Sequence, residues 1–189
     1  MFFARNSEIY GEAEPAEYVY KIMSGAVRTY NLLDDGRRQI GAFYLSGDIF
    51  GLELAGEHTS SAEAITDCKI LVVKRSTLVS LAGRDNEVAR ELWEMTAVEL
   101  QRAQAHIMLL IKTAQERVAG FLLEMAKRSA SGREVELPMS RQDIADYLGL
   151  TIETVSRTLT QLEKVAAINI PTSRRITLRN PVALTRLNS

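Results

Sequence analysis

The chain is poor in the residues that build disulfide frameworks and metal centres. Its 189 residues include one cysteine, Cys68, and two histidines, His58 and His106. One cysteine cannot close a disulfide, and it excludes a cysteine cluster for zinc or iron–sulfur within this sequence. Two histidines are too few for a cupin-like metal enzyme. We therefore expect no metal, no cofactor and no enzymatic activity, and a chain suited to the reducing cytoplasm.

Long apolar runs and a net excess of charge are also missing. No stretch approaches the roughly 20 apolar residues that cross a bilayer, and MFFARNSEIY at the start is unlike a secretory signal. We therefore expect no membrane partner. The net charge is −1, but from residue 137 onward seven basic residues face four acidic ones, which makes this end +3 and leaves −4 on residues 1–136. Such an asymmetry is expected where only one end of a protein meets nucleic acid.

Residues 1–84 have the pattern of a β-rich domain. Alternating runs such as YVYKI, GAVRTYNLL, RQIGAFYL and ILVVKR are separated by SG, DDG and SGD. In Asp34-Asp35-Gly36 the glycine can take the positive φ that a tight hairpin requires. Many short antiparallel strands at near-even spacing predict a barrel or a jelly-roll-like sandwich.

Residues 85–112 change to a helical period. Apolar and small residues recur at steps of three and four up to Ala114, which predicts one unbroken stripe about 30 Å long. A helix packed only on its own sheet is the alternative, but the length of the stripe and the polar character of the other faces favour a seam between two copies. The seam residues are expected to be Trp93, Thr96, Leu100, Ala103, Ile107 and Leu110.

Residues 113–189 are expected to contain a helix at 115–129, then two short helices and a hairpin. Ser140 is a candidate N-cap with Asp143 three positions on, Gly149 ends that helix, and Thr151 is a candidate cap for the next one. Two short helices joined by a Gly-containing turn are typical of a helix-turn-helix. The hairpin that follows would be a wing, with inward residues Ile168, Ile170, Ile176 and Leu178.

The stretch TIETVSRTLTQLE at 151–163 predicts a helix with one buried and one exposed face. Ile152, Val155, Leu159 and Leu162 form an apolar stripe, which leaves Glu153, Ser156, Arg157 and Thr160 outside. In the major groove, arginine forks onto guanine O6 and N7, glutamate accepts from cytosine N4, and serine bonds to several bases. The alternative is that Glu153 and Arg157 form a mere surface ion pair one turn apart.

Two sets of DNA contacts follow from this prediction. The expected base contacts are Glu153, Ser156, Arg157 and Ile152. Phosphate contacts, which position the protein without specifying sequence, are expected from Ser140, Arg141, Thr151, Thr154, Thr160, Arg174 and Arg175.

The order of these segments resembles the CRP/FNR superfamily of bacterial transcription regulators. The most specific matches are GDIFGLE at 47–53 and LPMSRQDIADYLGLTIETVSRTLTQLE at 137–163. The resemblance implies an α+β fold: an N-terminal antiparallel β-roll of the cyclic-nucleotide-binding type at 1–84, a long dimerisation helix at 85–112, and a C-terminal winged helix-turn-helix at 113–189. It also implies a cytoplasmic homodimer that binds double-stranded DNA and contacts RNA polymerase.

Finer matches indicate a branch of the superfamily. Glu153-x-x-Ser156-Arg157 is similar to the FNR-type reading triad, and Ile152 stands where the cyclic-AMP receptor branch has arginine. This favours a TTGA-N6-TCAA palindrome over TGTGA half-sites. RTYNLLDDGRRQIGAFYLSGDIFGLE and the segment at 116–125 resemble FixK-type regulators of microaerobic respiration and nitrogen fixation, which activate transcription. The target genes are not specified by the sequence.

The same resemblance bears on an effector. The chain lacks the amino-terminal cysteines of the FNR branch, and His58-Thr59 aligns where the cyclic-AMP branch holds phosphate with Arg-Ser. A neutral histidine replaces the arginine fork poorly, so we expect no cyclic-nucleotide response. His58 is expected to be solvated in a polar loop, and Cys68 to be a small core residue without a redox role. The alternative is a ligand-gated regulator with an unidentified small molecule in the β-roll.

Overall fold

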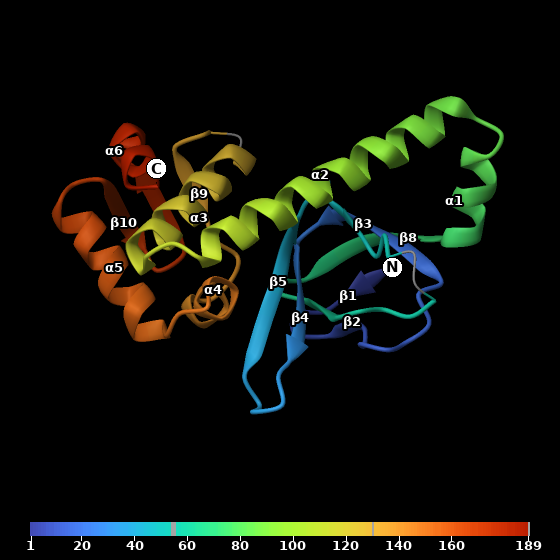
Figure 1. Cartoon of the computed structure of the whole chain (residues 1–189), viewed down its shortest axis with the longest axis horizontal. Coiled ribbons are helices and arrows are strands. Elements are labelled where there is room, and N and C mark those ends of the chain that lie inside the picture. The colour runs from blue at the N-terminus through green and yellow to red at the C-terminus, as the bar shows by residue number, and fades with distance from the viewer. Residues whose placement is uncertain (54–55, 130, 189) are drawn as a thin grey trace. The chain divides into compact units, whose positions relative to one another are not determined.

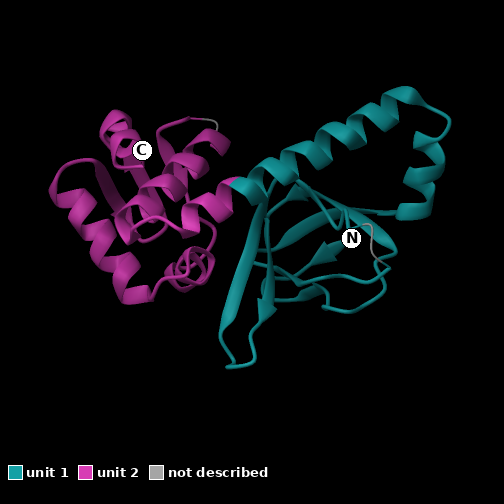
Figure 2. Cartoon of the chain, in the orientation of Figure 1, with its two compact units in different colours: residues 1–104 teal, residues 105–189 magenta. Residues whose placement is uncertain are grey.

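A computed structural model describes residues 1–53, 56–129 and 131–188. The chain divides into two compact units, residues 1–104 and residues 105–189, with the boundary inside helix α2 (Figure 2). Figure 1 labels most of the elements. They follow one another along the chain as β1 (Phe2–Phe3), β2 (Glu8–Tyr10), β3 (Tyr18–Ser24), β4 (Ala26–Leu32), β5 (Arg38–Leu45), β6 (Ile49–Phe50), β7 (Ser61–Ala64), β8 (Cys68–Lys74), α1 (Arg75–Ala82), α2 (Asn86–Leu110), α3 (Ala114–Arg128), β9 (Glu134–Glu136), α4 (Arg141–Leu148), α5 (Ile152–Lys164), β10 (Ile168–Thr172), β11 (Arg175–Leu178) and α6 (Pro181–Leu187).

The first unit contains two antiparallel four-stranded sheets, in the orders β1-β8-β3-β6 and β2-β7-β4-β5. The longest pairings join β3 to β8 and β4 to β5, with Val19 opposite Val73 and Val27 opposite Tyr44. The β4–β5 hairpin turns at Gly36, whose φ of 81° confirms the prediction that this turn requires a glycine. The β-roll expected for this part of the chain is therefore confirmed.

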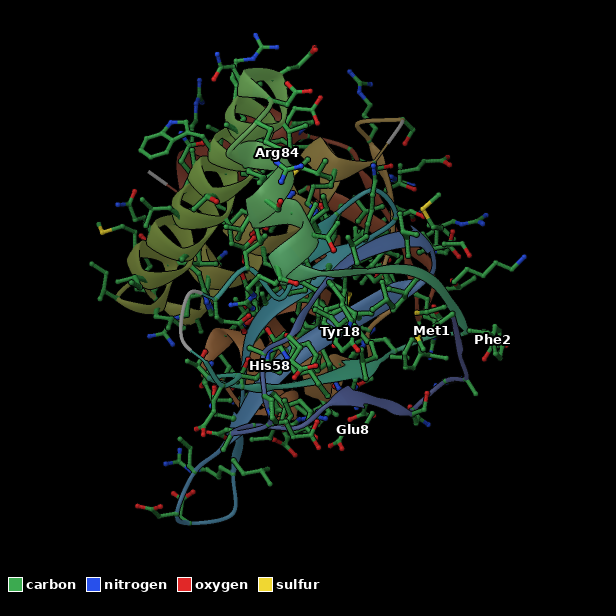
Figure 3. All side chains as sticks on the ribbon, turned by 90° about the vertical axis from the view of Figure 1, so that its right-hand side faces the viewer. Met1, Phe2, Glu8, Tyr18, His58 and Arg84 are labelled. Carbon is green, nitrogen blue, oxygen red and sulfur yellow. The ribbon has the colours of Figure 1, made fainter. Side chains whose placement is uncertain are left out.

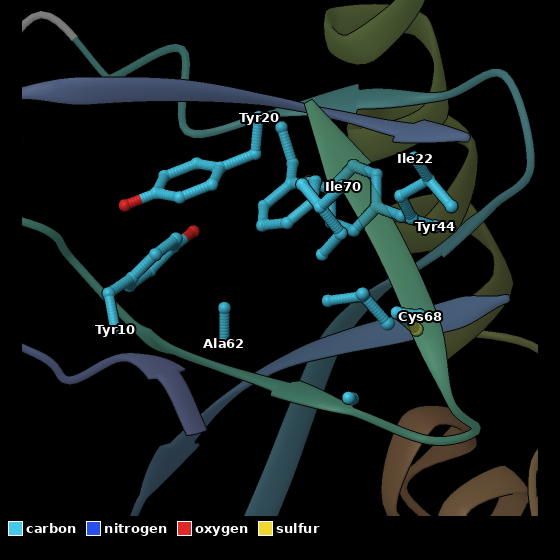
Figure 4. Packing of buried hydrophobic residues seen from close by; sticks show 10 residues of the cluster. Tyr10, Tyr20, Ile22, Tyr44, Ala62, Cys68 and Ile70 are labelled. Carbon is cyan, nitrogen blue, oxygen red and sulfur yellow. The ribbon is translucent and has the colours of Figure 1, made fainter. Parts of the chain in front are cut away.

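The core of the roll is filled from both sheets, because alternate residues of each strand point inward (Figure 4). One sheet contributes Tyr20, Ile22, Phe50 and Ile70, among others. Cys68 belongs to the same cluster, and its thiol donates to the carbonyl oxygen of Ala26 at 3.2 Å. Burial raises the pKa of this thiol, so Cys68 is a core residue, as expected, and a poor nucleophile.

Several elements of the first unit were not predicted. The expected β-domain at 1–84 ends in a helix, α1, whose described residues include none that is fully buried. Strands β1 and β6 have two residues each, and β2 and β7 have three and four. They are too short for an alternating pattern, and only their partners in the sheets define them.

The long apolar stripe breaks where α2 ends at Leu110. Ala114, expected on the same helix, is the first residue of α3. Thr113 caps α3 through a capping box, in which its side chain accepts from the N–H of Glu116 and the Glu116 carboxylate accepts from the N–H of Thr113 at 2.7 Å. A Thr-x-x-Glu sequence is typical of such a helix start. The prediction of one unbroken stripe up to Ala114 was therefore wrong.

The second unit packs helices around a small sheet of order β10-β11-β9. Its centre includes Phe121, Leu122, Leu148, Val155 and Leu162, all fully or nearly fully buried. The hairpin β10–β11 confirms the predicted wing, and β9 adds a third strand that was not expected. In the described residues no helix is long and apolar enough to cross a membrane.

Candidate nucleic-acid interface

Helices α4 and α5 form a helix-turn-helix whose ends are fixed by local hydrogen bonds. Ser140 caps α4 in a capping box with Asp143, and the predicted stop at Gly149 is confirmed by its left-handed backbone, with φ 61° and ψ 41°. Thr151 caps α5, its hydroxyl accepting from the N–H of Thr154 at 3.2 Å. Only Gly149 and Leu150 lie between the last residue of α4 and the cap of α5, so the turn is tight.

One face of α5 is buried, largely as predicted. Val155, Leu159 and Leu162 are buried, and Thr158 joins them although its polar side chain gave no such signal. Ile152, expected in the buried stripe, is 37% exposed. Ile152 is the first residue of the helix, and its neighbours Thr151 and Glu153 are exposed as well, so the buried stripe begins only at Val155.

The opposite face of α5 presents polar side chains to solvent. Glu153, Arg157 and Thr160 are exposed, and Ser156 is half-buried beside them. Hydrogen bonds from its own backbone N–H and from the Thr151 hydroxyl, aided by nearby Arg157, hold the pKa of Glu153 below its usual value. Glu153 is therefore an ionised acceptor at neutral pH. It forms no ion pair with Arg157 within 4.0 Å, which disfavours the surface-pair alternative.

Some of the expected phosphate-contacting hydroxyls already have intramolecular partners. The Thr160 hydroxyl donates to the carbonyl oxygen of Ser156 at 3.0 Å, and the Ser140 hydroxyl donates to Asp143 at 2.7 Å. Thr151 and Thr154 lie with their hydroxyl oxygens 3.1 Å apart. In the free protein Ser140 and Thr151 therefore begin helices, and Thr160 bonds back within α5. Each oxygen retains the capacity to accept a further bond.

The wing carries exposed arginines at its turn. Arg174 and Arg175 are both exposed, and Arg174 donates to the carbonyl oxygen of Pro138 at 3.2 Å, next to the start of α4. Arg141 is half-buried at the first position of α4. Two further exposed cations, Arg133 and Arg179, flank β9 and β11 and were not among the expected contacts. Recognition of β9 as part of the wing sheet would have indicated Arg133.

The apolar stripe of α2 is uncovered in the single chain. Trp93, Leu100 and Ile107 are 77%, 58% and 62% exposed, and Thr96 and Ala103 are exposed between them. Leu110, at the end of the stripe, is half-buried. Exposed apolar side chains aligned at heptad spacing are typical of a helix that pairs with another helix.

The β-roll contains a hollow of about 340 Å³ in the first unit. The residues that line it include Tyr10, Tyr44, Glu53 and Glu99. The Tyr44 hydroxyl donates to Glu99 at 2.6 Å, and burial, then the Glu99 charge, raises the pKa of Tyr44. Glu53 lies 3.8 Å from Arg75, whose guanidinium also donates to the carbonyl oxygen of Gly51. Among the described residues that line the hollow, the charged ones are Glu53 and Glu99, and none is an arginine or lysine that could clamp a phosphate.

The prediction that His58 is solvated was wrong. His58 is only 3% exposed, among the side chains of the roll (Figure 3), and its ring stacks on Tyr10 with 3.5 Å between centroids. Its Nδ1 lies 3.5 Å from a Glu53 oxygen. Thr59, the second residue of the aligned pair, lines the hollow, and its carbonyl oxygen accepts from Asn31. The tyrosine that buries His58 comes from β2, far away in sequence.

Comparisons with known proteins agree with this architecture. The Crp-like helix-turn-helix domain family matches residues 116–187, and the Cyclic nucleotide-binding domain family matches residues 1–85. The nitrogen fixation regulation protein FixK of Azorhizobium caulinodans is 56% identical, over 99% of this chain and 78% of that protein. The FixK protein of Rhizobium meliloti is 43% identical, over 95% of this chain and 82% of that protein.

A solved structure and a further relative agree with this family assignment. FixK2 from Bradyrhizobium japonicum has a TM-score of 0.95 and 55% sequence identity, covering 100% of this chain and 96% of that one. The fumarate and nitrate reduction regulatory protein of Escherichia coli is 32% identical, over 97% of this chain and 76% of that protein. These relatives are transcription regulators. The chain therefore belongs to the CRP/FNR superfamily of transcription regulators, in its FixK-type branch.

Proposed function

We propose that the protein is a homodimeric activator that binds a TTGA-N6-TCAA-like palindrome and contacts RNA polymerase, in the cytoplasm and without a cyclic-nucleotide or iron–sulfur effector. Glu153, Ser156 and Arg157 read base edges, with Ile152 against them at the first turn of α5. The names of the FixK relatives suggest that the genes it controls serve nitrogen fixation.

The exposed face of α5 carries this proposal. Glu153 and Arg157 lie one turn apart, both exposed and not paired with each other, on a helix held from behind by Val155, Leu159 and Leu162. An ionised carboxylate suits the N4 amine of cytosine, and a free guanidinium suits O6 and N7 of guanine. TTGA on one strand and its complement present both bases within one half-site.

The exposed stripe of α2 supports the palindrome. Two copies paired along Trp93, Leu100 and Ile107 would form a two-fold dimer, and a two-fold dimer matches a palindromic site. The centres of TTGA and TCAA in the proposed site are about 10 base pairs apart, which is one turn of the double helix. The two copies of α5, which are the proposed recognition helices, can then enter the major groove on one side of the DNA.

The absence of a nucleotide effector is supported by the chemistry of the hollow in the roll. Its charged wall residues include Glu53 and Glu99, which would repel a phosphate, and His58 is buried against Tyr10 rather than facing the hollow. The second candidate is a regulator of the same fold that responds to another small molecule. The observation that favours this second candidate is the volume of the hollow, about 340 Å³, which lies within the range of small-molecule sites.

Binding to paired duplexes tests the proposal. The purified protein without additives should prefer TTGA-N6-TCAA to a duplex with TGTGA half-sites by about tenfold or more, since at least one base pair per half-site is mismatched. Cyclic AMP or cyclic GMP should not change this affinity. Equal binding to both duplexes would refute the assigned reading triad, and a large gain in affinity with a nucleotide would favour the ligand-gated alternative. Transcription from the same site with purified polymerase tests activation separately.

A further inference from the structure

The carboxyl end of α4 leaves backbone carbonyls that its own helix cannot satisfy. The last four carbonyls of any α-helix lack intrahelical donors, and cations stabilise this negative end. At α4 the N–H groups of Gly149 and Leu150 both bond to the carbonyl oxygen of Ala145. The carbonyl oxygens of Tyr147, Leu148 and Gly149 accept hydrogen bonds as well. Their donors are side chains that lie outside the helix-turn-helix.

Two side chains from the preceding helices supply these donors. His106, in the last turn of α2, has its Nε2 2.8 Å from the carbonyl oxygen of Tyr147, and its ring stacks on the Tyr147 ring with 3.9 Å between centroids. Because a carbonyl only accepts, Nε2 carries the hydrogen. Arg117, in the first turn of α3, donates through Nη1 to the carbonyl oxygen of Leu148 at 2.8 Å and to that of Gly149 at 3.4 Å.

Arg117 also fixes its own position against the end of α2. Its Nε donates to the carbonyl oxygen of Lys112 at 2.8 Å, so one planar guanidinium joins the segment after α2 to the turn of the helix-turn-helix. Lysine could not reproduce this geometry, because a single ammonium lacks the rigid fork that reaches two sides at once. His106 precedes Ile107, one of the expected seam residues.

The segment held by these side chains leads directly into the recognition helix. Gly149 has φ 61°, and Thr151 caps α5 two residues later. The direction in which α5 starts is therefore set by the peptide groups that His106 and Arg117 hold. A small rotation of this turn would tilt the whole of α5, and with it Glu153 and Arg157.

We infer that Arg117 and His106 are positioning residues for DNA recognition, which fix the recognition helix to the end of the α2 seam and thereby set the spacing of half-sites that the dimer accepts. This inference rests on the proposed function. A single helix-turn-helix on one half-site can turn to fit it. Two of them on a palindrome must hold a fixed separation, so only the palindrome needs the clamp.

Duplexes with different spacers test this role. The affinities of the full-length protein are measured for TTGA and TCAA separated by five, six or seven base pairs, and for a duplex with one half-site. Arg117→Gln should reduce the preference for six base pairs by on the order of tenfold, because the three charge-assisted hydrogen bonds of the guanidinium are lost. Its affinity for the single half-site should change by less than about twofold, since no base or phosphate contact is removed.

Three other variants sharpen the result. Arg117→Lys keeps the charge and should recover only part of the preference. His106→Phe keeps the stack on Tyr147 but lacks the donor, and should lower the preference by a few-fold, on the scale of one neutral hydrogen bond. Lys127→Gln removes an exposed charge from the same helix, α3, and should leave the preference unchanged. Circular dichroism and sedimentation show whether each variant is folded and dimeric. If Arg117→Gln does not fold, the spacer preference of His106→Phe tests the clamp instead.

The possible failures are distinct. A wild-type protein with a sharp optimum at six base pairs and an Arg117→Gln variant with the same optimum would overturn the clamp alone. Equal losses on the palindromes and on the single half-site would also overturn it, because they would indicate a general loss of DNA affinity. A wild-type protein without any preferred spacing would refute the proposed palindrome, and the role of the clamp in reading it would fall too.

Discussion

Replacement of Ile107 by glutamate tests the seam along α2. Ile107 is 62% exposed in the single chain, and full burial of an isoleucine contributes about 1.5–3 kcal/mol. A seam that covers the exposed part would therefore gain about 1–2 kcal/mol from each copy, or about 2–4 kcal/mol per dimer. At 1.4 kcal/mol for each factor of ten, the loss weakens the dimer by at least about 30-fold. Two carboxylates facing each other in the seam add to this loss.

Sedimentation equilibrium at micromolar concentration measures the effect. Ile107→Glu should shift the protein toward monomer, whereas Met108→Glu should not. Met108 is the next residue on the same helix and is similarly exposed at 56%, but it lies off the heptad stripe, so it controls for the added charge. An Ile107→Glu protein with the mass of the wild-type dimer would refute the seam and leave the two-fold symmetry of the site unexplained.

Three further predictions concern the second unit. Gly149→Ala should lower the free energy of unfolding by about 1–2 kcal/mol in urea denaturation, because alanine is strained at φ 61°, and an unchanged midpoint would contradict the left-handed turn. Leu162→Ala should cost about 2–5 kcal/mol by the same measurement, because this side chain is fully buried, and a cost below 1 kcal/mol would place α5 elsewhere. Arg174→Ala should weaken binding to all duplexes alike and reduce the slope of log affinity against log salt by about one, and a sequence-dependent loss would assign Arg174 to bases instead.

The helix-turn-helix was well predicted because its signals are local. The cap at Ser140, the stop at Gly149 and the cap at Thr151 each depend on residues within one turn of a helix end, and all three are confirmed. The wing followed from alternation over a few residues. Such features are read correctly because the residues that define them are neighbours in the sequence.

The wrong predictions concern features that depend on distant residues or on a neglected local signal. The burial of His58 comes from its stack on Tyr10, which no pattern around residue 58 reveals. Strands β1 and β6 are defined only by their partners. The stripe through Ala114 is wrong for a local reason, because the capping box of Thr113 and Glu116 starts a new helix within the apolar period. The clamp formed by Arg117 on α4 also joins residues about 30 positions apart, and it was not predicted.

The central claim is that Arg157 contacts a guanine of the half-site, and a double-mutant cycle between protein and DNA tests it most directly. Wild-type protein and Arg157→Ala are each titrated onto TTGA-N6-TCAA and onto the same duplex with the guanine of each half-site replaced by adenine. We expect Arg157→Ala to cost about 1–3 kcal/mol on the first duplex and almost nothing more on the second, so that the coupling energy nearly equals the loss. Equal losses on both duplexes, with no coupling, would show that the arginine does not read that base.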